Sequence, residues 1–78
     1  MSDFVDKKER VADLIEDYIQ DDSKEKELLS FIHDLSIDDD FKNKELFHSI
    51  FKELSSSLSE LSRRELKQRI LMIRSFIE

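Results

Sequence analysis

The chain has 78 residues and a net charge of −6, and it contains no glycine, proline or cysteine. Its length allows only one domain, because a typical domain has roughly 100–150 residues. Without glycine and proline, tight hairpins, phosphate-binding loops and all-β folds are disfavoured, and without cysteine there are neither disulfides nor thiolate ligands. We therefore expect residues 1–78 to form a single all-α domain, a small bundle of four short helices.

The first predicted helix covers residues 3–20, with Ser2 or Asp3 as its N-cap. Its apolar residues recur at steps of three and four and cover half of the helix surface, which favours packing against two neighbouring helices. The other half, extended by one residue beyond the helix, is an acidic face that consists of Asp13, Glu16, Asp17 and Asp21.

The second predicted helix covers residues 24–34 and follows a break in the periodicity at residues 20–23. Asp22 or Ser23 can cap it, and Glu25 lies three residues after Asp22, as in a capping box. Its apolar face has the spacing i, i+3, i+4, i+7 and consists of Leu28, Phe31, Ile32 and Leu35.

The third predicted helix follows an acidic loop at residues 36–40. It begins between Asp40 and Asn43 and ends between Ser57 and Ser59. It is the strongest periodic segment of the chain, because its apolar residues approach heptad spacing. This stripe consists of Phe47, Ile50, Phe51, Leu54, Leu58 and Leu61.

The fourth predicted helix covers residues 63–77 and has the clearest start. Ser62 and Glu65 have the spacing of a capping box, and Leu61 and Leu66 that of a hydrophobic staple. Leu71 points away from the apolar face, so it is either an ordinary exposed leucine or a contact for a partner. That face consists of Leu66, Ile70, Ile73, Phe76 and Ile77.

We expect the third and fourth helices to form an antiparallel hairpin, and the stripes of the first and third helices to form the centre of the bundle. Since no glycine is present to end a helix in the left-handed conformation, the C-terminal ends of the first three helices are the least defined boundaries.

The charges are unevenly distributed along the chain. Residues 1–61 contain 17 acidic and 8 basic residues (net −9), whereas residues 62–78 contain 2 acidic and 5 basic residues (net +3). An acidic body with a basic last helix can pair with a second copy, or it can offer each end to a different partner. Alternatively, the basic helix neutralises the acidic helices within one bundle.

No residue pattern indicates catalysis, a metal or a cofactor. Asp38, Asp39 and Asp40 lack the spacing, the central glycine and the closing glutamate of a calcium loop. His33 and His48 lack a second ligand at zinc-like spacing, and His48 and Ser49 point about 100° apart on a helix. We therefore expect a protein that is not an enzyme and binds no cofactor.

The basic residues of the last predicted helix could contact phosphates, but the net charge of −9 in residues 1–61 repels nucleic acid. Only Phe76 offers an aromatic ring there, and it lies on the apolar face. We expect no direct binding of nucleic acid. No apolar run approaches the roughly 18 residues needed to cross a bilayer, and no signal peptide is apparent, so we expect an intracellular protein of the cytoplasm or nucleus.

The last two predicted helices share features with a known family. The sequence Glu-Leu-Phe-His-Ser-Ile-Phe opens the first of them at residues 45–51, and Leu61-Ser62 leads into basic and aliphatic residues of the second. In these features residues 45–77 resemble the BESS motif, a two-helix interaction module of insect nuclear regulators. The resemblance implies self-association, or binding to other regulatory proteins, through the apolar helix faces.

Two hypotheses for the function follow. The first is a non-enzymatic interaction or oligomerisation module, expected as a homodimer, because so small a core gains stability from a partner. Its expected contact residues are Phe47, Ile50, Phe51, Leu54, Leu66, Ile70, Leu71 and Ile73. The second is a small acidic inhibitor or immunity protein, of the kind carried by phages and plasmids, that blocks a basic nucleic-acid-binding surface with its acidic face.

Overall fold

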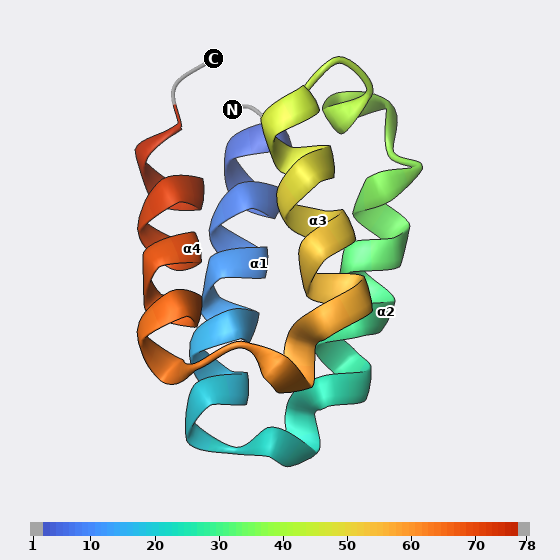
Figure 1. Cartoon of the computed structure of the whole chain (residues 1–78). Coiled ribbons are helices and arrows are strands. Elements are labelled where there is room, and N and C mark those ends of the chain that lie inside the picture. Colours follow the sequence, from blue (N-terminus) through green and yellow to red (C-terminus); the bar gives the residue numbers. More distant parts are fainter. Residues whose placement is uncertain (1–2, 77–78) are drawn as a thin grey trace.

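The structure, a computed structural model, describes residues 3–76 and contains four helices (Figure 1). They are α1 (Asp3–Gln20), α2 (Glu25–Ser36), α3 (Glu45–Ser57) and α4 (Arg63–Ser75), and no strand occurs in this part of the chain. Short 3₁₀ turns at Asp22–Lys24, Asp39–Phe41 and Leu58–Glu60 lie between them. The prediction of a small all-α bundle of four helices is confirmed.

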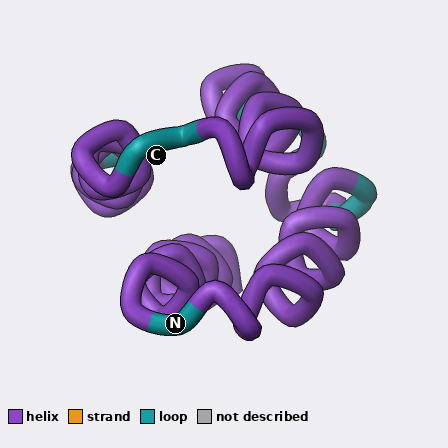
Figure 2. The backbone as a smooth tube through the Cα atoms, turned by 60° about the horizontal axis from the view of Figure 1, so that its bottom comes forward, coloured by secondary structure: helices purple, strands orange, loops and turns teal. Residues whose placement is uncertain are grey.

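Successive helices run in opposite directions, and the view along the bundle places them around one core (Figures 1 and 2). The helix α1 packs closely against both α2 and α4, and α2 packs closely against α3. This agrees with the wide apolar stripe of α1, which predicted two neighbours. The backbones of α3 and α4 approach each other less closely, but the two helices form the predicted antiparallel hairpin.

The predicted stripes of α1 and α3 meet inside the bundle, where the rings of Phe4 and Phe47 lie 5.5 Å apart. Helices α2 and α4 cover this centre with their own buried residues. The buried apolar residues among positions 3–76 are Phe4, Val11, Ala12, Leu14, Ile15, Leu28, Ile32, Leu35, Phe41, Phe47, Ile50, Phe51, Leu54, Leu58, Leu66, Ile70 and Ile73.

One end of the bundle is filled by aromatic rings. Phe47 lies at its centre, with ring centroids 5.3 Å from Phe41 and 4.8 Å from Phe76, and Phe4 and Phe51 complete the group. Phe41 belongs to the turn Asp39–Phe41 rather than to a helix, yet it is fully buried. This turn also explains why α3 begins at Glu45, later than the sequence predicted.

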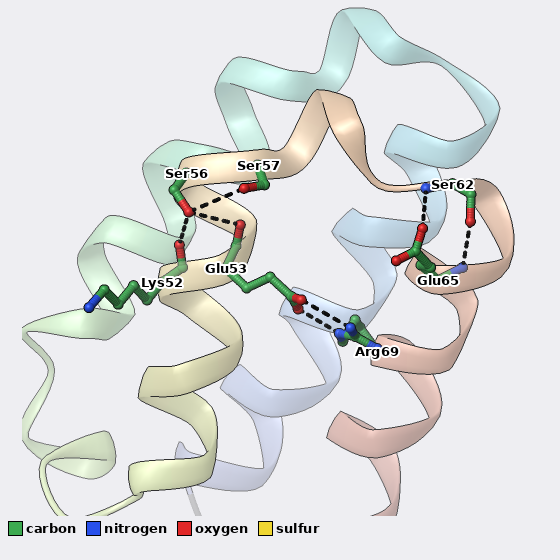
Figure 3. Close-up of polar contacts among 7 residues, drawn as sticks. All are labelled: Lys52, Glu53, Ser56, Ser57, Ser62, Glu65 and Arg69. Carbon is green, nitrogen blue, oxygen red and sulfur yellow. Dashed lines mark hydrogen bonds and ion pairs between the residues drawn. The ribbon is translucent and has the colours of Figure 1, made fainter.

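The sequence predicted the capping box at the start of α4 correctly, but it did not predict the capping residue before α2. At α4 the capping box is present, because Ser62 Oγ accepts from the backbone N–H of Glu65 and the Glu65 carboxylate accepts from that of Ser62 (Figure 3). Before α2, the predicted caps Asp22 and Ser23 are wrong. The residue that caps is Asp21, whose carboxylate accepts from the backbone N–H of Ser23 and starts a 3₁₀ turn one residue earlier.

The remaining boundaries differ by small amounts. Helix α2 continues to Ser36, two residues beyond the prediction, and α4 ends at Ser75, since Phe76 has an extended backbone. Asp3 is the first helical residue of α1 rather than its cap, and the alternative cap, Ser2, lies outside the described residues, as does Ile77.

The helices end without any left-handed residue, because no residue described has a positive φ. At the end of α4 a lysine side chain donates hydrogen bonds to backbone carbonyl groups that have no partner within the helix. The Lys8 ammonium group donates to the carbonyl oxygen of Phe76 over 3.0 Å and to that of Arg74 over 3.4 Å. Lys8 is 8% exposed and is the one buried charged residue between residues 3 and 76.

Candidate functional site

A hollow of about 350 Å³ lies between α1 and α4. Its lining comes from Glu16, Ile19 and Gln20 of α1 and from Lys67, Ile70, Leu71 and Arg74 of α4. We call it the α1–α4 groove. Ile19 also lines a smaller hollow of about 170 Å³ with Tyr18, Asp22, Arg63 and Leu66, so the depression continues along both helices.

The groove follows from the helical spacing of its lining residues. Lys67, Leu71 and Arg74 are four and three residues apart, so they share one flank of α4, and this flank faces α1. Ile70 lies next to Leu71 but points into the core and is 4% exposed, whereas Leu71 is 65% exposed. Leu71 therefore forms an exposed apolar edge beside an apolar floor.

Arg74 binds three carboxylates of α1. Its Nη1 donates to Glu16 over 2.7 Å, its Nη2 to Asp13 over 2.8 Å and its Nε to Glu9 over 3.3 Å. The hydrogen bond to Glu16 is the main reason why the pKa of the Arg74 guanidinium is raised above its usual value. The basic last helix thus neutralises part of the acidic first helix within one chain.

The other basic residues of α4 divide into two kinds. Arg69 forms an ion pair within the chain, because its guanidinium donates to both carboxylate oxygens of Glu53 on α3, over 2.6 Å and 3.0 Å (Figure 3). In contrast, Arg63, Arg64 and Lys67 are exposed and form no ion pair with any residue between 3 and 76. Three positive charges without an ion pair to residues 3–76 therefore remain on α4, and Lys67 among them lines the groove with Leu71.

Because of the Glu53–Arg69 ion pair, the free energy of unfolding should depend on pH in the acid range. The hydrogen bonds from Arg69 lower the pKa of Glu53 in the folded chain, and Lys7 lowers the pKa of Asp38 in the same way. A carboxyl group with a lower pKa in the folded state stabilises the fold above its unfolded pKa of about 4, and this contribution is lost as the pH falls through the folded value.

We therefore expect the free energy of unfolding to stay level from about pH 7 to about pH 5 and to fall below about pH 4. In the variant Glu53→Gln this acid-induced loss should be smaller. Urea titrations followed by circular dichroism at several pH values measure both. An equally steep loss in Glu53→Gln and in the wild type would show that this pair does not contribute.

The acidic loop and the histidines have structural contacts. The Asp38 carboxylate accepts from the backbone N–H of Asp40 and forms an ion pair with Lys7, whose ammonium also contacts Asp40. The His48 Nε2–H donates to the carbonyl oxygen of Phe41 over 2.6 Å, while His33 is exposed. No group of three or more residues able to hold a metal occurs within residues 3–76.

Most of the expected partner-contact residues lie in the core. Leu71 is the one exposed member of the set, and a partner cannot reach the others while the bundle keeps this conformation. The buried members are Phe47, Ile50, Phe51, Leu54, Leu66, Ile70 and Ile73. The apolar faces that carry the resemblance to the BESS motif are therefore occupied by the chain's own helices.

The predicted acidic face is partly occupied by contacts within the chain. Asp13 and Glu16 bind Arg74, and Asp21 accepts hydrogen bonds from the backbone and the hydroxyl group of Ser23. Asp17 is exposed and has no such contact within residues 3–76. On the α1 side of the groove, Glu16 belongs to the predicted acidic face, but Ile19 and Gln20 were not predicted as site residues. Nothing in the sequence indicates that the first and last helices are neighbours.

The comparisons with known proteins identify no relative: no family model, no curated protein and no solved structure matches this chain. None of the helices described for residues 3–76 has the length and apolar character that a membrane span requires.

Proposed function

We propose that this chain is a non-enzymatic protein-interaction module that contacts its partner through the α1–α4 groove. The observation that carries the proposal is Leu71, which is 65% exposed beside Ile19 and Ile70. Protein–protein interfaces commonly have a few apolar residues at their centre, surrounded by polar and charged groups. Leu71 together with the free charges of Arg63 and Lys67 fits this pattern.

Ile37, which is even more exposed than Leu71, fits less well. Ile37 is 74% exposed, but it lies in the turn after α2, beside a hollow whose other lining residues are all polar or charged. Singly exposed apolar residues of this kind are normal on protein surfaces. Ile37 is therefore a matched control for Leu71, since it is an aliphatic residue of similar size and exposure at a different place.

The acidic inhibitor remains a second candidate because of the outer face of α1. Asp6 and Asp17 lie there, both exposed and without an ion pair to any residue between 3 and 76. A basic surface on a target protein would pair with these carboxylates, and the attraction would weaken as salt screens it.

The two candidates predict different losses when the chain is used to capture proteins from a lysate of its source cells. We expect a protein that is retained by the wild type and by Ile37→Glu but lost by Leu71→Glu. The double variant Asp6→Lys/Asp17→Lys should retain it if the groove is the contact surface. Loss with that double variant alone would favour the acidic inhibitor, and retention by all variants would refute both candidates.

A further inference from the structure

The two sides of the α1–α4 groove carry opposite charges. On α4, Lys67 lines the groove, and Arg63 and Arg64 lie on the preceding turn. On α1, Glu16 lines the groove while it binds Arg74 of the same chain, and the exposed carboxylate of Asp17 follows it. Between the two sides lies a strip of apolar side chains that consists of Ile19, Ile70 and Leu71.

Resting on the proposed function, we propose that the partner is a second copy of this chain. In the dimer, α1 of each copy lies over α4 of the other. A surface of this kind is self-complementary, because a two-fold rotation brings each acidic side opposite a basic side and joins the apolar strips. The dimer contact includes α1, whereas the resemblance to the BESS motif covers only residues 45–77.

The charges select one orientation of the two-fold axis. An axis across the helices would place α4 over α4 and bring Arg64 and Lys67 close to their own copies, which costs electrostatic energy. An axis along the helices instead places the basic flank of α4 over the acidic flank of α1. The second arrangement is therefore the one that the surface favours.

This orientation also fixes which residues meet. Rotation about an axis along the helices keeps each residue at its height in the bundle, so residues that line one level of the groove face each other across the dimer. Lys67 then faces Glu16 and Gln20 of the second copy. Leu71 meets Ile19, the half-buried residue of the apolar floor, in the second copy.

The contact area is small. Helix α4 has 13 residues and is therefore about 20 Å long, so its flank covers less than the roughly 800 Å² per partner of a standard interface. We expect a weak and reversible dimer whose population depends on the protein concentration.

Sedimentation equilibrium of the pure chain from about 10 μM to about 1 mM, the range of weak complexes, measures this. The weight-average mass should rise from 9.4 kDa towards twice that value. Leu71→Glu should raise the dimer dissociation constant about tenfold or more, because it removes the apolar anchor. Ile37→Glu, the matched control, should behave as the wild type.

A charge exchange tests the orientation. Lys67→Glu and Gln20→Lys should each weaken the dimer, because each brings like charges together across the groove. An equimolar mixture of the two variants should associate more strongly than either alone, since the introduced glutamate faces the introduced lysine at one contact and the other contact keeps the wild-type pair. Both positions are exposed, and circular dichroism checks that the variants fold.

A chain that stays monomeric up to about 1 mM refutes the dimer, while groove-dependent capture of a different protein would leave the proposed function intact. A dimer that Leu71→Glu does not weaken uses another surface. A mixture of the two variants that is no stronger than its components would refute the predicted pairing.

Discussion

Replacing Phe47 by alanine should lower the free energy of unfolding by about 3–5 kcal/mol, the usual cost of removing a buried aromatic side chain. Phe47 is fully buried, and its ring contacts those of Phe4, Phe41, Phe51 and Phe76. No neighbouring helix can move in to fill the cavity without disturbing the other four rings. Since a core of this size rarely supplies more than about 3–5 kcal/mol, the variant should be largely unfolded.

The control for this variant is Leu46→Ala, one position earlier on α3. Leu46 is 42% exposed, so its removal should cost less than about 1 kcal/mol while changing helix propensity similarly. Phe47→Leu keeps most of the volume and should remain folded with an intermediate loss. Urea titration followed by circular dichroism gives the values for Leu46→Ala and Phe47→Leu, and Phe47→Ala should show no cooperative transition. A transition in Phe47→Ala at the same urea concentration as in Leu46→Ala would contradict the central role of the ring.

The second large effect is expected for Lys8→Met. Methionine keeps most of the aliphatic chain but has no ammonium group, so the carbonyl groups of Arg74 and Phe76 lose their donor. Hydrogen bonds from charged groups contribute about 1.5–3 kcal/mol to stability, and we expect the free energy of unfolding of Lys8→Met to fall by this amount. The loss should be concentrated in the last turn of α4.

Hydrogen exchange followed by NMR separates this local effect from a general one. In Lys8→Met the amides of the last turn of α4 should exchange faster, relative to those of α2, than in the wild type. Lys26→Met is the control, because Lys26 is exposed on α2 and its loss changes the net charge equally. If both variants lose the same stability, the charge rather than the contact with α4 is responsible.

The fold class and the course of two helices were predictable from local signals. The range of α1 and the first residue of α4 agree with the prediction, because both depend on apolar periodicity and on the box formed by Ser62 and Glu65. These signals act within a few residues, so the sequence alone contains them.

The errors arise where several local solutions compete. A run of aspartates offers several caps, and the structure uses Asp21 and Asp38, each of which starts a 3₁₀ turn before the following helix. The second turn carries Phe41 into the core, although a single aromatic residue next to three aspartates resembles a loop. Only the space left between α1 and α3 determines that this ring is buried.

The candidate site was half predictable. Leu71 could be assigned to the surface, because it lies off the apolar face of its helix. On the α1 side, Glu16 was in the predicted acidic face, but Ile19 and Gln20 could not be found, since they require knowledge that the first and last helices are neighbours. The same holds for Lys8, whose function as a donor at the end of α4 depends on residues 66 and 68 positions further along the chain.

The pairing of the first helix with the last has a consequence during synthesis. While the chain is made from its N-terminus, α1 and α2 can already associate, but the flank of α1 that α4 covers has no partner. It stays open until Arg74 and Phe76 have left the ribosome and the Lys8 and Arg74 contacts can close. At about 5–20 residues per second, synthesis of the segment from the end of α2 to Phe76 takes several seconds. The bundle can therefore close only after release of its last helix, and a ribosome stalled within α4 would present α1 to chaperones and proteases.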